Sequence, residues 1–329
     1  MFQALRDDLI PLVEAIQSAP RKPDLTIMHR DYSEDRQESF GKMAAAAIGF
    51  DFESGRLDET THPFCSGLGP GDTRITTRYD RNEFNQAFFG ILHEAGHGLY
   101  DQGLVTEHWG TPAGEAVSLG IHESQSRMWE NFVGRSPSFW RYFYPKLKEV
   151  FPEALSDVSE EAFVFAVNDV RPSTIRVEAD EVTYNLNILL RFEMEMALID
   201  DGLSVDDIPE VWNQKFEHFF GFAIKDDTEG CLQDIHWSGG GIGYFPTYTL
   251  GNLYGAQFFD SAKDEIGDLD AQFAAGEFEP LKVWMTEKIY SQGMRYLPND
   301  LVQEVTGKPL SHEPLIGHLK RKYFELYGL

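Results

Sequence analysis

The sequence predicts a mainly α protein with one small β element, and three observations support this. Apolar residues recur at three- and four-residue steps over most of the chain, while β-branched residues cluster in one short run. With 42% hydrophobic and 13% aromatic residues, the 329-residue chain can bury a large core. We see no internal repeat, linker or low-complexity segment, so we expect a single continuous domain over residues 1–329.

The periodicity places the elements in order along the chain. Residues 59–80 contain glycine and proline followed by the β-branched run Thr73–Thr77, which predicts a hairpin or small sheet. The stretch SGGGIGYFPTY at 238–248 has too many glycines for a helix and predicts a loop. Amphipathic helices are expected at residues 2–17, 83–100, 114–133, 181–200, 209–220 and 310–327.

Charge and targeting signals narrow the class of protein. A net charge of −26 makes nucleic acid an unfavourable partner. No apolar run approaches the roughly 20 residues of a membrane span, and the N-terminal stretch has no basic leader. Cys65 and Cys231 are the only cysteines, and we expect two buried, reduced thiols. These features predict a cytoplasmic protein with neither a membrane nor a nucleic-acid partner.

One motif carries chemistry. Residues His93-Glu94-Ala95-Gly96-His97 form the H-E-x-x-H pattern within a predicted helix. In a helix, His93 and His97 differ by about 40° around the axis and lie about 6 Å apart along it, so both imidazoles can reach one ion. Glu94 lies at the edge of the same face, where it can act on a water at the ion. Two histidines and a glutamate can also decorate a helix without any metal.

A third ligand makes the metal interpretation stronger. Catalytic zinc sites have three protein ligands and an open position, and Glu123 lies near the middle of the next predicted helix. Glu115 competes as a ligand, but its place near the predicted helix start favours a role as an N-terminal charge partner. Two histidines and a carboxylate suit Zn best, while Co or Mn fit the same geometry.

Six motifs, in this order along the chain, resemble the carboxypeptidase Taq family of metallocarboxypeptidases. They are HPF at 62–64, DTRIT at 72–76, HEAGH at 93–97, HESQ at 122–125, IRVEAD at 175–180 and GCLQDIHW at 230–237. The resemblance implies a homodimeric carboxypeptidase of broad specificity, with a small sheet bordering a deep substrate groove. Family members usually carry a longer N-terminal helical region, so residues 1–60 are expected to be a shortened N-terminal part and residues 60–329 the motif-bearing part.

The resemblance also implies catalytic roles. His93, His97 and Glu123 would hold the ion, and Glu94 would be the general base that activates a metal-bound water, in agreement with the helix geometry. The developing oxyanion needs a donor, for which His236 and Tyr248 are the candidates. For each of these aromatic residues taken alone, core packing is the commoner explanation.

An exopeptidase must also bind the free carboxylate of its substrate. Arg176 is the candidate because a guanidinium can donate two parallel hydrogen bonds, and the alternative is a structural ion pair with Asp180. Further substrate-binding candidates are Arg74, whose strand can instead offer backbone edges to a peptide, and His62 and Tyr244. His122 is expected to support the ligands or line the groove.

Two other functions use the same residues. An endopeptidase or aminopeptidase would share the metal site without a carboxylate-binding arginine. An inactive or peptide-binding remnant would be expected to have lost a ligand or the base, and all four positions are present. The sequence therefore favours the metallocarboxypeptidase.

Overall fold

The computed structural model describes residues 1–329. Helices hold 62% of the residues and strands 5%, which confirms the mainly α prediction. The chain divides into two compact units: Met1–Lys22, Asp169–Leu250 and Ser311–Leu329 form the first, and Pro23–Asn168 and Gly251–Leu310 form the second. The assignment of residues 1–329 to one catalytic domain stays a prediction.

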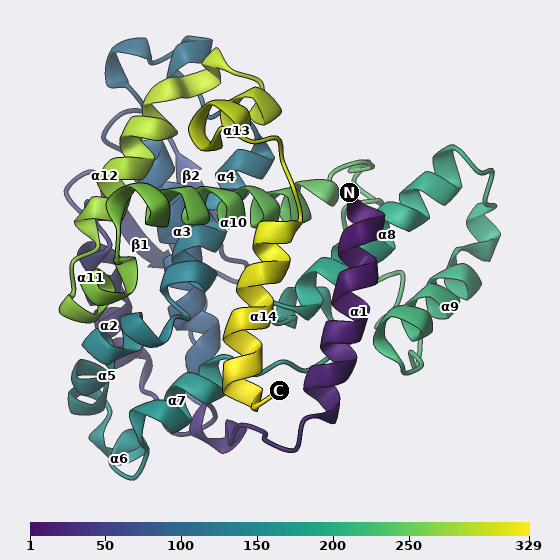
Figure 1. Ribbon diagram of the computed structural model, residues 1–329, viewed down its shortest axis with the longest axis horizontal. Coiled ribbons are helices and arrows are strands. Elements are labelled where there is room, and N and C mark those ends of the chain that lie inside the picture. The colour runs from purple at the N-terminus through teal and green to yellow at the C-terminus, as the bar shows by residue number, and fades with distance from the viewer. The chain divides into compact units, whose positions relative to one another are not determined.

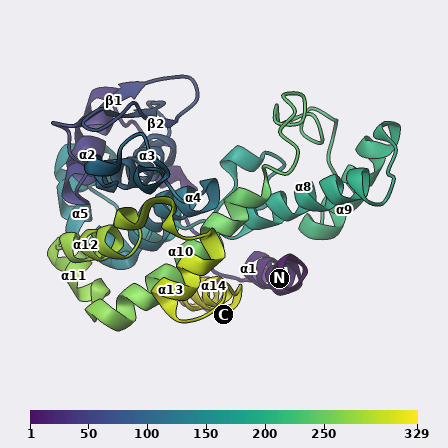
Figure 2. The same ribbon diagram turned by 90° about the horizontal axis from the view of Figure 1, so that it is seen from above.

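The second unit contains the small sheet. Strands β1 (Gly55–Glu59), β2 (Cys65–Gly67) and β3 (Thr73–Thr77) lie in the order β1-β3-β2. β1 runs parallel to β3 and β2 antiparallel to it, and Ile75 of the central strand is fully buried. Figure 2 shows β1 and β2 beside helix α3 (Phe84–Gly103), against which β2 and β3 pack. The predicted small sheet is confirmed.

Helix α3 is the centre of the second unit. The Glu83 side chain accepts a hydrogen bond from the backbone N–H of Asn85 and so caps its first turn. Its N-terminal half packs into an aromatic cluster. The Phe84 and Phe88 rings stack with their centroids 5.2 Å apart, and the Trp140 and Phe163 ring centroids are 4.7 Å apart. Such buried aromatic contacts hold the helix rigidly and so fix the side chains that it carries.

Some of the other helices of the second unit pack directly against α3. Directly against it pack α2 (Glu34–Ala47), α4 (Leu119–Arg127) and the π-helix Met128–Val133 that continues α4. The remaining helices are α5 (Pro137–Val150), α6 (Pro152–Leu155), α7 (Glu160–Val167), α10 (Pro246–Ile266, of which Gly251–Ile266 belongs to this unit), α11 (Leu269–Ala275), α12 (Glu279–Lys288) and α13 (Pro298–Thr306).

The first unit is built from four long helices. They are α1 (Phe2–Ser18), α8 (Thr183–Ile199), α9 (Ile208–Phe220) and α14 (Glu313–Tyr327). The purple α1 and the yellow α14 run side by side in Figure 1, and α1 also packs against α8. Leu5, Leu9 and Ile16 of α1 are fully buried, as the helical spacing predicts. No helix of either unit has the length and apolar character needed to cross a bilayer.

Two predicted boundaries are wrong. The helix expected at residue 114 begins at Leu119, because the Ser118 hydroxyl accepts a hydrogen bond from the backbone N–H of Ile121 and caps it there. The loop expected to reach residue 248 ends earlier, because α10 begins at Pro246, a residue that fits the first turn of a helix. Glu115 therefore lies outside the helix, and Tyr248 lies within one.

Candidate metal centre

The two predicted ligand helices cross at a glycine. A Cβ atom placed on Gly96 would stand only 2.6 Å from the carbonyl oxygen of Gln125 and 2.6 Å from the Cα of Ser126. Any side chain at this position would push the helices apart, so glycine permits α3 and α4 to pack backbone against backbone. This crossing brings Glu123 of α4 over the face of α3 that carries His93 and His97.

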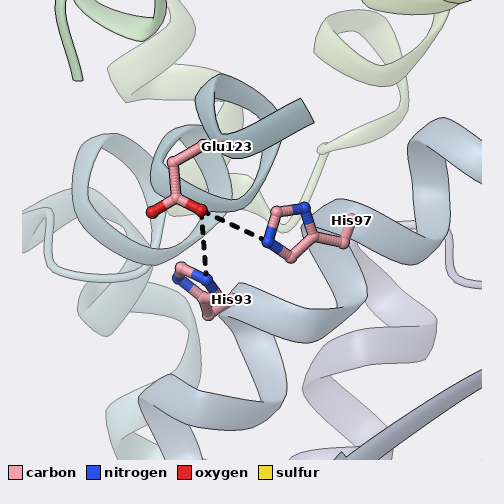
Figure 3. Close-up of side chains that lie close together, drawn as sticks. All are labelled: His93, His97 and Glu123. Carbon is pink, nitrogen blue, oxygen red and sulfur yellow. Dashed lines mark ion pairs between the residues drawn. The ribbon is translucent and has the colours of Figure 1, made fainter. Parts of the chain in front are cut away.

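Three donor atoms converge at the crossing (Figure 3). Glu123 Oε2 lies 3.4 Å from Nε2 of His97 and 3.7 Å from Nε2 of His93. One ligand atom from each of the three residues lies within 4.8 Å of the others. Two imidazole nitrogens and one carboxylate oxygen that face a common point are a donor set suited to a divalent transition-metal ion. These residues therefore fit the ion that the motif implies.

The outer nitrogen of His93 is held by a carboxylate. Its Nδ1 lies 2.9 Å from Oε2 of Glu130, which belongs to the π-helix. Burial by itself would raise the pKa of Glu130, but Arg127, His93 and Arg135 together lower it to about 2. Glu130 is thus an ionised acceptor, and it directs the Nδ1–H of His93 toward itself and the Nε2 lone pair toward Glu123.

His97 is held by a chain of two hydrogen bonds. Its Nδ1 lies 2.7 Å from Nδ1 of His122, and Nε2 of His122 lies 3.1 Å from Oδ1 of Asp101. Because the carboxylate can only accept, His122 donates from Nε2 and accepts at Nδ1 from His97. His97 then carries its proton on Nδ1 and leaves Nε2 free for an ion.

Electrostatics separate the acidic groups of the centre. Burial lowers the pKa of His97 to about 4, so the ring is neutral near pH 7 as ligation requires. Burial would raise the pKa of Glu123, yet Arg127, His93 and His97 hold it well below its usual range. For Glu94, which is 7% exposed, burial raises the pKa to about 7, with Glu123 and Glu130 adding to the effect. A carboxyl group with a pKa near neutrality suits a group that takes and returns a proton.

The first unit contains a separate polar cluster around Arg176. Nε and Nη2 of Arg176 contact Oδ1 of Asp234 at 2.9 and 2.8 Å, and Nη1 donates to the Tyr184 hydroxyl at 3.2 Å. The other oxygen of Asp234 contacts Nε of the fully buried Arg191 at 2.6 Å. These contacts engage Nε and one N–H on each terminal nitrogen of Arg176, which leaves a second N–H on each. Two parallel N–H groups are what a bidentate carboxylate needs.

Aromatic side chains surround this arginine. The carbon atom of its guanidinium lies 5.3 Å from the ring centre of Tyr248 and 5.7 Å from that of Phe245. The His236 ring stands 5.4 Å from the Tyr244 ring, and its Nδ1 lies 3.8 Å from Asp234. The predicted residues Arg176, His236, Tyr244 and Tyr248 thus form one cluster in the first unit.

Other predicted residues lie elsewhere. Arg74 is exposed and pairs with Asp72 at 2.9 Å, while His62 is exposed. Asp180 does not contact Arg176 but accepts hydrogen bonds from the backbone N–H groups of Val182 and Thr183. Glu115 is absent from the converging donor group.

The two cysteines are free thiols. Cys231 is buried as predicted, whereas Cys65 is half-buried beside Asp101, and burial holds the pKa of its thiol far above the usual value. Desolvation of the thiolate therefore makes Cys65 a poor nucleophile.

Several supporting residues escaped the sequence analysis. Asp101, Arg127, Glu130 and Arg191 were not predicted, although the spacing Glu123-x3-Arg127-x2-Glu130 places three charged side chains on one helical face. Asp234 lies within the quoted GCLQDIHW motif without having been assigned a role.

Two histidines of an H-E-x-x-H helix that meet a glutamate from the following helix define the class of metallopeptidases with two histidine ligands and one glutamate ligand. The comparisons with known proteins are more specific. Residues 1–323 match the family described as carboxypeptidase Taq (M32) metallopeptidase. The chain belongs to this family.

Its relatives are carboxypeptidases. The chain is 53% identical to thermostable carboxypeptidase 1 of Thermus thermophilus over 328 residues, covering all of this chain and 64% of that protein. It is 43% identical to carboxypeptidase 1 of Bacillus subtilis, covering all of this chain and 66% of that protein. A crystal structure of the M32 carboxypeptidase from Deinococcus radiodurans R1 superposes with a TM-score of 0.98 at 42% identity, covering 100% of this chain and 66% of that one. The chain thus spans about two-thirds of the length of these relatives.

Proposed function

We propose that this chain carries the catalytic site of a metallocarboxypeptidase that removes residues from the C-terminus of peptides. The observation that supports it most directly is the convergence of His93, His97 and Glu123, with both histidines presenting Nε2. The carboxypeptidase relatives named above supply the direction of cleavage.

Glu94 acts as the base. A divalent ion at this centre supplies Lewis acidity, which polarises the scissile carbonyl and makes the attacking water more acidic. Glu94 takes the proton of that water through its carboxylate and returns it to the amine of the leaving residue. Its pKa, which burial raises to about 7, matches both the gain and the loss of a proton near neutral pH.

Arg176 recognises the substrate. Asp234 occupies the Nε side of the guanidinium, and the two remaining N–H groups can receive the α-carboxylate as a pair of parallel hydrogen bonds. The guanidinium also lies within cation–π distance of the Tyr248 and Phe245 rings, which attract its positive charge. His236 and Tyr248 as donors to the oxyanion, and His62, Arg74 and Tyr244 as further substrate contacts, stay predictions.

The decisive assay uses one N-blocked peptide with either a free or an amidated C-terminus. Release of the C-terminal residue from the free acid alone supports the proposal. Internal cleavage of both forms would indicate an endopeptidase, cleavage only of an N-free peptide an aminopeptidase, and binding without cleavage a peptide-binding remnant. Any of these three results contradicts the carboxypeptidase.

Two variants test the roles. Glu94→Gln should lower kcat by about 10²–10⁴-fold while the metal content stays at one ion per chain. Arg176→Ala should lower kcat/KM for the free acid by about 10–100-fold, mainly through KM, because two charge-assisted hydrogen bonds are lost. A Glu94→Gln variant that stays active would refute the role of Glu94. An Arg176→Ala variant that loses as much activity on the amidated peptide as on the free acid would refute the role of Arg176.

Zinc as the ion, a homodimeric state and a cytoplasmic location also belong to the proposal. Zinc is favoured by the two-histidine and one-carboxylate donor set. Metal analysis, sedimentation velocity and cell fractionation test the three separately.

A further inference from the structure

Arg127 occupies a distinctive position beside the metal centre. It ends α4, four residues after Glu123 and three residues before Glu130. Its side chain is only 12% exposed, and the side chains of Glu123 and Glu130 are 8% and 13% exposed. A buried guanidinium is costly unless its N–H groups are paired, so the partners of Arg127 indicate what it does.

The first partner is the carboxylate ligand. Nε of Arg127 donates to Oε1 of Glu123 at 2.7 Å. The opposite oxygen, Oε2, faces His93 and His97. Arg127 therefore fixes the rotation of the carboxylate and leaves Oε2 directed toward His93 and His97, the residues that would hold an ion with it.

The second partner leads to a histidine ligand. Nη1 of Arg127 donates to Oε2 of Glu130 at 3.0 Å, and the same oxygen lies 2.9 Å from Nδ1 of His93. Glu130 thus stands between the arginine and the imidazole. One rigid guanidinium is connected directly to Glu123 and through Glu130 to His93.

The shape of the Arg127 side chain distinguishes it from a lysine of the same charge. The two acceptors are reached from different nitrogens of one planar group, Nε and Nη1, whose separation and angle are fixed by the guanidinium. A lysine ammonium keeps the charge but is a single point on a flexible stem. It can neutralise the charge of the two glutamates without fixing the orientation of both carboxylates.

We propose that Arg127 is a positioning residue that preorganises two of the three metal ligands, Glu123 directly and His93 through Glu130, by the geometry of its fork. The inference rests on the metal centre of the proposed function and adds to it a residue that touches neither ion nor substrate. His97 is held independently by His122 and Asp101, so the remaining ligand does not depend on Arg127.

The experiment compares Arg127→Lys and Arg127→Gln with the parent protein. Each metal-free protein is titrated with Zn²⁺ in competition with a chromophoric chelator, and the absorption spectrum of the Co²⁺-loaded protein reports the coordination geometry. The control is Arg141→Lys, the same exchange at an exposed arginine that pairs with Glu160. Circular dichroism and thermal unfolding of the metal-free proteins verify that each variant is folded.

Both Arg127 variants should bind Zn²⁺ about 10–100-fold more weakly than the parent, which is the usual effect of removing a group that orients a ligand. The Co²⁺ spectrum should change in both, and Arg141→Lys should match the parent. A Lys variant with the parent affinity and spectrum would overturn the inference, because charge alone would then suffice. A Gln variant that binds as tightly as the parent would overturn it as well.

If neither Arg127 variant folds, Glu130→Ala, which removes the acceptor oxygen, tests the His93 arm while leaving the bond between Arg127 and Glu123 in place. It should also weaken Zn²⁺ binding and alter the Co²⁺ spectrum, and an unchanged affinity overturns the inference. Since all these readouts are independent of peptide cleavage, a parent protein that binds metal but cleaves no peptide would refute the proposed function and leave this inference standing.

Discussion

Gly251 offers the sharpest test of how the fold places a metal ligand. A Cβ atom at this position of α10 would stand 2.5 Å from Cγ and 2.7 Å from Cβ of Glu123. Since carbon atoms pack at about 3.5–4.0 Å, Gly251→Ala requires the Glu123 side chain or the helix to move by about 1 Å. Metal-ligand bonds tolerate errors of only about 0.2 Å, so we expect the loss of the Glu123 ligand.

The magnitudes follow from this displacement. Overpacking of this kind costs about 1–3 kcal/mol of the free energy of unfolding. Loss of ligand placement should weaken Zn²⁺ binding by at least about 10–100-fold. Urea unfolding of the metal-free protein measures the first, and chelator competition the second.

The matched control is Gly255→Ala, one turn further along the same helix. A Cβ atom there would meet the carbonyl oxygen of Ser124 at 3.3 Å and Cε2 of Phe132 at 3.4 Å, which small shifts can accommodate. Replacement of glycine by alanine within a helix is favourable by about 0.5–1 kcal/mol, so this variant should be close to neutral and bind metal normally. If Gly251→Ala behaves like Gly255→Ala in both assays, the steric reasoning is refuted.

Three further predictions concern the buried polar groups and the ion. Asp101→Ala should weaken Zn²⁺ binding by about 10–100-fold, because His122 loses the acceptor that fixes its tautomer, whereas Asp101→Asn keeps an acceptor oxygen and should retain most of the affinity; equal losses in both variants would contradict this. Glu181→Gln should cost about 3–5 kcal/mol in urea unfolding, because the buried carboxylate accepts hydrogen bonds from Lys322 at 2.6 Å and from Tyr323 at 2.8 Å, and the substitution removes the negative charge that faces the Lys322 ammonium. Glu325→Gln, at an exposed position of α14, should be neutral. Burial would raise the pKa of Glu181, but Lys322 and His318 hold it far below its usual value, so its stabilising contribution is present above that usual value and is lost as pH falls through the folded pKa; a Glu181→Gln variant that keeps the acid sensitivity of the parent would argue against this. Saturating metal should stabilise the folded protein, by about 2.7 kcal/mol at a free concentration 100 times Kd, and a chelator should reverse the gain; no shift in the unfolding midpoint would refute metal binding at this centre.

Much of the metal centre was predictable from sequence because it depends on local periodicity. His93 and His97 share a helical face whatever the rest of the chain does, and α3 was predicted over most of its length. The choice between Glu123 and Glu115 also came from helix position, and the cap at Ser118 strengthened it by excluding Glu115 from the helix. The candidate Arg176 came from the family resemblance, because the helical periodicity of apolar residues cannot identify a substrate-binding arginine.

The partners of these residues were not predictable in the same way. Asp180 is four residues from Arg176 and was the natural candidate for an ion pair, but it accepts hydrogen bonds from backbone N–H groups at the start of α8, while Asp234, distant in sequence, pairs with the guanidinium. Reasoning from the sequence favours ion pairs between residues that are close along the chain. Which charges are buried together depends instead on how the chain folds.

The sequence by itself determined that the chain is mainly helical and that His93, His97 and Glu94 lie close together on one helix, since a fixed helical spacing needs no tertiary information. Only the tertiary structure decided how the ligands are held: Gly96 and Gly251 admit Glu123 to the centre, Arg127 and Glu130 turn His93, and Asp101 and His122 turn His97. The physical reason is the distance along the chain between the residues that interact. Periodicity follows from the geometry of one helix, whereas steric admission and hydrogen-bond direction depend on atoms that only packing brings together.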